Sequence, residues 1–141
     1  MNIDVFSKSQ LNHEIQEQSV LLFQQLNSEI HQRPLNEVLD QDENIIFVAC
    51  LIEGKLVGMA TMALYKVISG YKGMIEDVVV DRDQRGSGIG RKLMERLLKE
   101  GKNRNLNEIL LFSGHHRKAA ISLYKSLGFQ LKSSGLYALK P

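Results

Sequence analysis

The sequence predicts an α/β protein of the α+β type, in which helices cover both faces of a mixed, mostly antiparallel sheet. Apolar, β-branched segments at 45–52 and 56–65 flank a Glu-Gly-Lys turn, a pattern typical of a β-hairpin. Between residues 74 and 112, a strand, an amphipathic helix and a second strand follow one another. Such a unit joins parallel neighbours through a right-handed crossover, so the sheet must contain both kinds of pairing.

The first half of the chain adds two helices and a loop to this scheme. Apolar residues recur at helical intervals from 13 to 30 and predict an amphipathic helix, and a short helix is expected after Pro34, from 35 to 39. Residues 66–73 contain two glycines and a serine and are interpreted as a loop. The strand at 74–80 is almost continuously apolar near its end, which indicates that both of its faces are covered.

The second half alternates helices and strands. A helix begins after Gly88, with leucines on one side and basic residues on the other. A strand is expected at 106–112 and a helix from 117 to 127, which ends at a glycine. Residues 130–139 are expected to supply one more strand or a final hairpin.

Length and composition are those of an ordinary globular protein. The chain has 141 residues, 43% hydrophobic and 24% charged, and is predicted to form one domain over residues 1–141. No apolar stretch approaches the roughly 20 residues of a membrane span, and the N-terminus does not resemble a signal peptide. We therefore expect a cytoplasmic protein with no membrane partner. The single cysteine, Cys50, excludes an internal disulfide.

The charge distribution favours a phosphorylated ligand over a nucleic acid. A formal charge of +2 is too small to indicate a basic nucleic-acid-binding face. Basic residues nevertheless gather near residue 88. Lys92, Arg96 and Lys99 are interpreted as the solvated face of a helix, whereas Arg85 and Arg91 lie nearest the glycines and are the better candidates for phosphate contacts.

The segment Arg85-Gly-Ser-Gly-Ile-Gly90 is the strongest chemical signal in the chain. Its glycines allow the backbone to approach a ligand, and its amides lie at the positive N-terminal end of a helix. A nucleoside-triphosphate loop requires Gly-Lys-Ser/Thr, but Arg91 and Lys92 follow Gly90. A dinucleotide fingerprint requires a third glycine where Arg91 stands. A plain strand-to-helix turn is the remaining alternative.

Two motifs in the same order resemble the GCN5-related N-acetyltransferases (the GNAT superfamily). The spacing Arg85-x-x-Gly88-x-Gly90 is similar to the family's Arg/Gln-x-x-Gly-x-Gly/Ala segment, which binds the pyrophosphate of acetyl-coenzyme A (acetyl-CoA). Residues 117–129 are similar to the family's Asn-x-x-Ala-x-x-Phe-Tyr-x-x-x-Gly-Phe, with Arg117 in place of the asparagine. The resemblance covers about residues 42–135.

The resemblance implies a fold, a co-substrate and site residues. In the family, the two central parallel strands, here 74–80 and 107–113, splay apart around the pantetheine arm of acetyl-CoA. The tyrosine of the second motif, Tyr124, is implied to protonate the departing thiolate; a satisfied core tyrosine is the alternative. The residues predicted to contact acetyl-CoA are Val78, Val79, Val80, Arg85, Gly86, Ser87, Gly88, Ile89, Gly90, Arg91 and Arg117.

The base is less strongly indicated. Glu76 and Asp77 resemble the acidic pair in Gly-x-Ile-Glu-Asp-x-x-Val of the glucosamine-phosphate N-acetyltransferases, and Glu76 is predicted to accept a proton. Neighbours in a regular strand point to opposite faces, so only one of the two is expected to face the cleft. A structural ion pair and a histidine base remain alternatives. Candidate substrate contacts are Asp77, Tyr71, His115 and His116, and no metal site is expected.

These features predict an enzyme that acetylates a primary amine of a small molecule or peptide. Cys50 lies inside an apolar strand and is interpreted as an inert thiol, so direct transfer in a ternary complex is preferred to an acetyl-cysteine route. A non-catalytic acyl-CoA-binding or regulatory domain on the same fold is the alternative, and nucleic-acid binding is third. The sequence leaves open the acceptor and whether the chain forms a homodimer.

Overall fold

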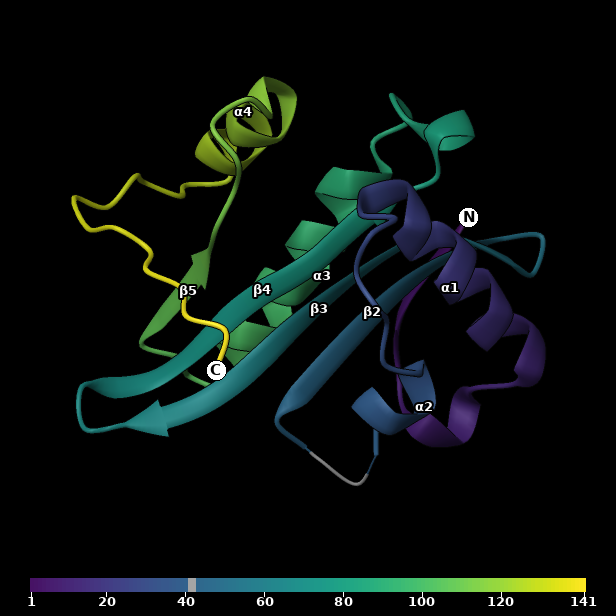
Figure 1. Cartoon of the computed structure of the whole chain (residues 1–141), viewed down its shortest axis with the longest axis horizontal. Coiled ribbons are helices and arrows are strands. Elements are labelled where there is room, and N and C mark those ends of the chain that lie inside the picture. Colours follow the sequence, from purple (N-terminus) through teal and green to yellow (C-terminus); the bar gives the residue numbers. More distant parts are fainter. Residues whose placement is uncertain (41–42) are drawn as a thin grey trace.

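The computed structural model describes residues 1–40 and 43–141, and its centre is a five-stranded sheet (Figure 1). The strands lie side by side in chain order, the first three pairings are antiparallel, and the last is parallel. This arrangement confirms the mixed, mostly antiparallel sheet predicted from the sequence. The strands are β1 Asn2–Phe6, β2 Ile45–Ile52, β3 Lys55–Val67, β4 Gly70–Val80 and β5 Glu108–Leu111.

Helices cover both faces of the sheet, as predicted (Figure 1). Helices α1 (His13–Leu26) and α2 (Leu35–Val38) pack on one face, and α3 (Ile89–Asn103) packs on the other, with α4 (Lys118–Ser126) beyond the end of β5. Short 3₁₀ turns occupy Lys8–Gln10 (η1) and Arg82–Gln84 (η2). Within the described residues, every helix is too short or too polar to cross a membrane.

The alternation of side chains along β2 divides the apolar core into two layers. Phe47 and Ala49 point toward α1, whereas Val48 and Cys50 point toward α3, and all four are buried. Because β2 lies in the interior of the sheet, both faces of it are apolar and no polar alternation appears in its sequence. The sheet is therefore packed on both faces, and this packing fixes the position of β4.

Three segments differ from the sequence-based prediction. Residues 2–6 form an edge strand that was not predicted, although Ile3 and Val5 alternate with polar residues. The predicted loop at 66–73 is wrong, because the β3–β4 hairpin continues to the Val67–Gly70 pair and only Ile68 and Ser69 form the turn. No strand forms at 130–139, where isolated apolar residues are interrupted by Ser-Ser-Gly and Tyr137 is 95% exposed.

Helix α1 begins at a side-chain cap that provides a test of this fold. The Asn12 amide oxygen accepts a hydrogen bond from the Ile15 N–H at 2.8 Å. We expect Asn12→Ala to lower the free energy of unfolding by about 1 kcal/mol, measured by urea denaturation, because the first turn loses this acceptor. The control is Asn103→Ala, at an exposed position near the end of α3, which should change stability by less than about 0.5 kcal/mol.

Candidate active site

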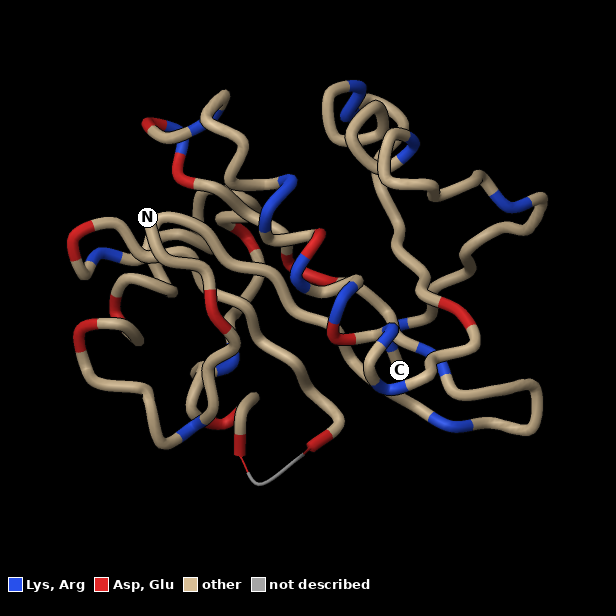
Figure 2. The backbone as a smooth tube through the Cα atoms, turned by 180° about the vertical axis from the view of Figure 1, so that it is seen from behind, with Lys and Arg blue, Asp and Glu red and all other residues tan. Residues whose placement is uncertain are grey.

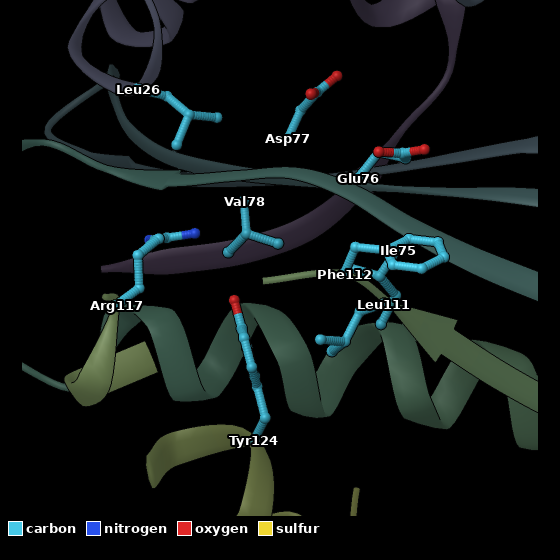
Figure 3. A pocket seen from close by; sticks show the side chains of 9 residues that line it. All are labelled: Leu26, Ile75, Glu76, Asp77, Val78, Leu111, Phe112, Arg117 and Tyr124. Carbon is cyan, nitrogen blue, oxygen red and sulfur yellow. The ribbon is translucent and has the colours of Figure 1, made fainter. Parts of the chain in front are cut away.

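A pocket opens where β4 and β5 separate. The two strands pair in parallel from Lys72–Glu108 to Ile75–Leu111; β5 then ends, while β4 continues to Val80. The β5-facing edge of β4 beyond Ile75 therefore has no partner strand among the described residues. A cavity of about 170 Å³ lies at this point (Figure 3). Its lining consists of Leu26, Ile75, Glu76, Asp77, Val78, Leu111, Phe112, Arg117 and Tyr124.

Strand β4 contains a bulge at Asp77 that the sequence did not indicate. The pairing register with β3 shifts between Met59–Val79 and Thr61–Glu76, so that one extra residue is inserted in β4. Ile75 and Val78 both pack in the α3 layer although they are three residues apart, and Asp77 has a left-handed backbone (φ 54°). Aspartate tolerates this conformation better than most residues with a side chain.

The bulge changes where the two carboxyl groups point. In a regular strand Glu76 and Asp77 would lie on opposite faces, and this prediction is wrong. Figure 3 shows both side chains on the α1 side of β4, whereas Val78 and the Tyr124 hydroxyl lie on the other side. Both carboxyls line the pocket, and neither forms an ion pair among the described residues. The strand irregularity therefore builds an acidic wall.

Both residues are exposed at the rim of the pocket, but the surrounding protein partly desolvates their carboxyls. Desolvation raises the pKa of Asp77, and desolvation together with the negative charge of Asp77 raises the pKa of Glu76. A carboxyl with a raised pKa is a stronger base when it is ionised. The pair therefore suits proton acceptance and the binding of a cation.

A stability measurement tests the unfavourable charge of Asp77. Folding raises the pKa of Asp77, so the protonated carboxyl adds to the free energy of unfolding at low pH. This added stability is lost as pH rises through the raised pKa. We expect Asp77→Asn, which keeps the side-chain shape, to raise the melting temperature at neutral pH. This gain should disappear as pH falls below the ordinary Asp value of 3.8. Asp83→Asn, an exposed acid outside this pocket, is the control. A lower melting temperature for Asp77→Asn at neutral pH contradicts the interpretation.

Tyr124 enters the pocket from α4. The residue is 7% exposed. Its ring packs edge-on against Phe129, with centroids 6.2 Å apart, and the Phe129 N–H donates to the Tyr124 carbonyl. Gly128, at φ 101°, turns the chain so that Phe129 can fold back in this way. Figure 3 shows the phenol oxygen pointing toward Val78. The packing thus fixes the ring while its hydroxyl faces the cavity.

Arg117 stands at the residue before α4 and also faces the pocket. Its side chain is half-buried and extends toward Val78 and Leu26 in Figure 3. Within the described part of the chain, no carboxylate lies within ion-pair distance of it. A half-buried guanidinium without a counter-ion is suited to an anionic ligand.

The glycine loop leads into α3 and presents free backbone donors. Gly86 and Gly88 have φ values of 86° and 84°, and a Cβ at either position would meet no atom within 4 Å. Their conformation, and not crowding, explains why glycine stands there. Gly88 is the N-cap of α3 and supplies no side-chain acceptor, so no side chain of the described residues caps the first-turn N–H groups. The loop is therefore open to an anion.

Basic side chains surround this helix terminus. Arg85 donates through Nε to the Val80 carbonyl at 3.2 Å, which holds the loop against the end of β4. Arg91 donates to the Ser126 hydroxyl and links α3 to α4. Helix α4 carries lysines and no acidic residue, as Figure 2 shows. These basic side chains favour the binding of an anion near the start of α3.

Other predicted residues lie outside the cavity. Tyr71 packs under Lys66, whose Nζ lies 4.8 Å from the ring centroid, and His115 and His116 are exposed on the loop after β5. None of the three lines the pocket, and their role in substrate binding stays a prediction. Cys50 is fully buried in β2, where desolvation raises the pKa of its thiol. Among residues 1–40 and 43–141, no cluster of His, Cys, Asp or Glu could hold a metal ion.

Four apolar lining residues were missed by sequence reasoning. Ile75 and Leu111 occupy the last pair of the β4–β5 ladder, and Phe112 follows it. Leu26 ends α1 and reaches the cavity from the opposite face of the sheet. Each was predicted only as an apolar position of a helix or strand. The point at which two strands diverge is a tertiary feature, and a local apolar pattern does not reveal it.

Comparison with known proteins places this geometry in a family. The acetyltransferase (GNAT) family model matches residues 10–129, and the chain belongs to that family. It is similar to an uncharacterized N-acetyltransferase of Methanocaldococcus jannaschii, with 34% identity over 98 residues, or 67% of this chain and 43% of that protein. It is also similar to an L-methionine sulfoximine/L-methionine sulfone acetyltransferase of Pseudomonas paraeruginosa, with 30% identity over 61% of this chain and 51% of that protein.

The chain thus matches only about half the length of these curated relatives. Over its whole length the fold is similar to a solved Trypanosoma brucei acetyltransferase, with a TM-score of 0.80, 22% identity and coverage of 99% of both chains. The family and the splayed-sheet fold implied by the two sequence motifs are therefore confirmed.

Proposed function

We propose that this protein is an acetyl-CoA-dependent N-acetyltransferase that moves an acetyl group to a primary amine by direct transfer while both substrates are bound. One observation carries the proposal. In the pocket where β4 and β5 separate, the Tyr124 hydroxyl lies on one side of β4 and the carboxyls of Glu76 and Asp77 lie on the other. An acid and a base on opposite sides of a transfer site are what aminolysis of a thioester requires.

The residues around the opening between β4 and β5 suit the binding of acetyl-CoA. We propose that its diphosphate binds the uncapped start of α3 and the loop before it, where the glycines leave the backbone accessible. Arg117 would supply a further positive contact, and the free edge of β4 at Val78–Val80 would hold the pantetheine arm. The proposed contacts are those predicted from the sequence: Val78, Val79, Val80, Arg85, Gly86, Ser87, Gly88, Ile89, Gly90, Arg91 and Arg117.

The proposed chemistry places a proton acceptor on one side of β4 and a proton donor on the other. Acetyl-CoA supplies a thioester carbonyl that a neutral amine can attack. Glu76 accepts the proton that the amine loses, directly or through water, and Tyr124 donates its phenolic proton to the sulfur as the carbon–sulfur bond breaks. Main-chain N–H groups of Val78–Val80 stabilise the negative charge that develops on the carbonyl oxygen. Cys50 is buried away from the pocket, which supports direct transfer.

A thiol-release assay tests this function against the alternative of a non-catalytic acyl-CoA-binding domain. Purified protein is incubated with acetyl-CoA and a panel of primary amines, and free thiol is measured over time. We expect amine-dependent thiol release that saturates with both substrates. Binding of acetyl-CoA without thiol release for any amine supports the non-catalytic alternative.

A further inference from the structure

The bulge in β4 leaves two carboxyl groups on the α1 side of the strand, which we call the acceptor side because the proposed base, Glu76, lies there. The proposed reaction uses only one of the two carboxyls. Glu76 is the proposed base. Asp77 lies next to it on the same side of the strand, in a backbone conformation that disfavours most side chains. A regular strand would have turned Asp77 toward the α3 face. The second carboxyl on the acceptor side thus results from the bulge.

Among the residues that the structure describes, no cation forms an ion pair with this second carboxyl. The basic residue of the pocket is Arg117, which lies across β4 on the Tyr124 side and is not within ion-pair distance of either carboxyl. Partial desolvation and mutual repulsion both disfavour two charges at this point. A positively charged ligand would reduce the repulsion between the two carboxylates, because it supplies a counter-charge.

The neighbouring side chains describe the rest of such a ligand. Leu26 of α1 lies beside Asp77 in Figure 3, and Phe112, 56% exposed, follows the end of β5. Apolar groups next to carboxylates suit a chain of methylenes that carries ammonium groups.

We infer that the acceptor is an aliphatic diamine or polyamine, whose reacting amine is bound by Glu76 and whose second ammonium group is bound by Asp77. This inference rests on the proposed function. It assigns Asp77 to specificity: Glu76 receives the proton of the reacting nitrogen, while Asp77 stays ionised and pairs with a nitrogen that does not react.

Three amines of equal chain length test the inference in the thiol-release assay: 1,4-diaminobutane, n-butylamine and 4-aminobutyrate. They carry a second positive charge, no second charge and a negative charge, respectively. We expect kcat/KM for 1,4-diaminobutane to exceed that for n-butylamine by about tenfold or more, and 4-aminobutyrate to be the poorest acceptor. Equal values for the three amines would overturn the inference while leaving the acetyltransferase function intact.

Substitutions locate the selectivity. Asp77→Asn keeps the shape and tolerates the left-handed backbone, and we expect it to reduce the diamine-to-monoamine ratio of kcat/KM to about 1. Glu76→Gln should lower kcat for both amines and keep most of the ratio. Asp83→Asn, which removes the same charge outside this pocket, should leave the ratio as in the wild type. A ratio that survives in Asp77→Asn contradicts the assignment.

A binding measurement separates this inference from the proposed function. In the presence of coenzyme A, 1,4-diaminobutane should raise the melting temperature of the wild type more than n-butylamine does, and Asp77→Asn should abolish the difference. If no amine releases thiol but this diamine-specific stabilisation is found, the proposed catalysis fails and the binding site stands. If neither is found, both fail.

Discussion

Replacing Tyr124 with Phe is expected to lower kcat by about 100-fold or more, because the variant has no proton to give to the departing sulfur. The affinity for acetyl-CoA should stay close to that of the wild type. Tyr124 is 7% exposed and its ring packs edge-on against Phe129, so the substitution removes one hydroxyl and little packing. Steady-state kinetics with a saturating amine gives kcat, and calorimetry gives the affinity for acetyl-CoA.

The control for this substitution is Tyr65→Phe, on β3 and outside the pocket. It should leave kcat within about twofold of the wild type. A Tyr124→Phe enzyme with unchanged kcat shows that Tyr124 is not the acid. A variant that loses acetyl-CoA affinity together with rate places Tyr124 in binding instead of proton transfer. The two results are distinguishable because rate and affinity are measured separately.

Replacing Gly88 with Ala is expected to weaken acetyl-CoA binding by about tenfold or more. The backbone at Gly88 has φ 84°, and a Cβ there costs about 1–2 kcal/mol in the left-handed region. The new side chain would also project into the space that lies open before the first turn of α3. Isothermal titration calorimetry measures the loss of affinity, since tenfold corresponds to about 1.4 kcal/mol.

Gly54→Ala is the matched control, because it imposes the same strain elsewhere. Gly54 turns the β2–β3 hairpin at φ 79°, and a Cβ there also meets nothing within 4 Å. Both variants should lose similar stability in urea denaturation, and only Gly88→Ala should lose acetyl-CoA affinity. Equal affinities for the two variants would mean that the glycine loop is a structural turn, the alternative that its sequence left open.

Local sequence patterns predicted the elements that surround the site but not their irregularities. The strand at 74–80 and the helix after Gly88 were predicted because apolar runs and glycines are local signals. The edge strand at 2–6 was missed because it is short. Its apolar and polar residues alternate over too few positions to indicate a strand, which forms by pairing with β2. Residues 66–73 contain turn-forming residues, yet cross-strand pairing extends the hairpin through them.

The candidate site shows the same division between local and tertiary signals. Tyr124, Arg117, Glu76, Asp77 and Val78 were predicted, and all five line the cavity. The relation between the two carboxyls was predicted wrongly, because strict alternation assumes a regular strand and a bulge depends on pairing with β3. The acidic wall, and with it the proposed diamine specificity, could be found only in three dimensions.

Calorimetric titration of the purified wild-type protein with acetyl-CoA tests the central claim most directly: that the backbone amides from Arg85 to Gly90, at the uncapped start of α3, bind a diphosphate. We predict a saturable isotherm with one site per chain, in which free coenzyme A competes. The absence of any saturable heat, together with an unchanged melting temperature at high acetyl-CoA concentration, would contradict the account whatever Tyr124 does.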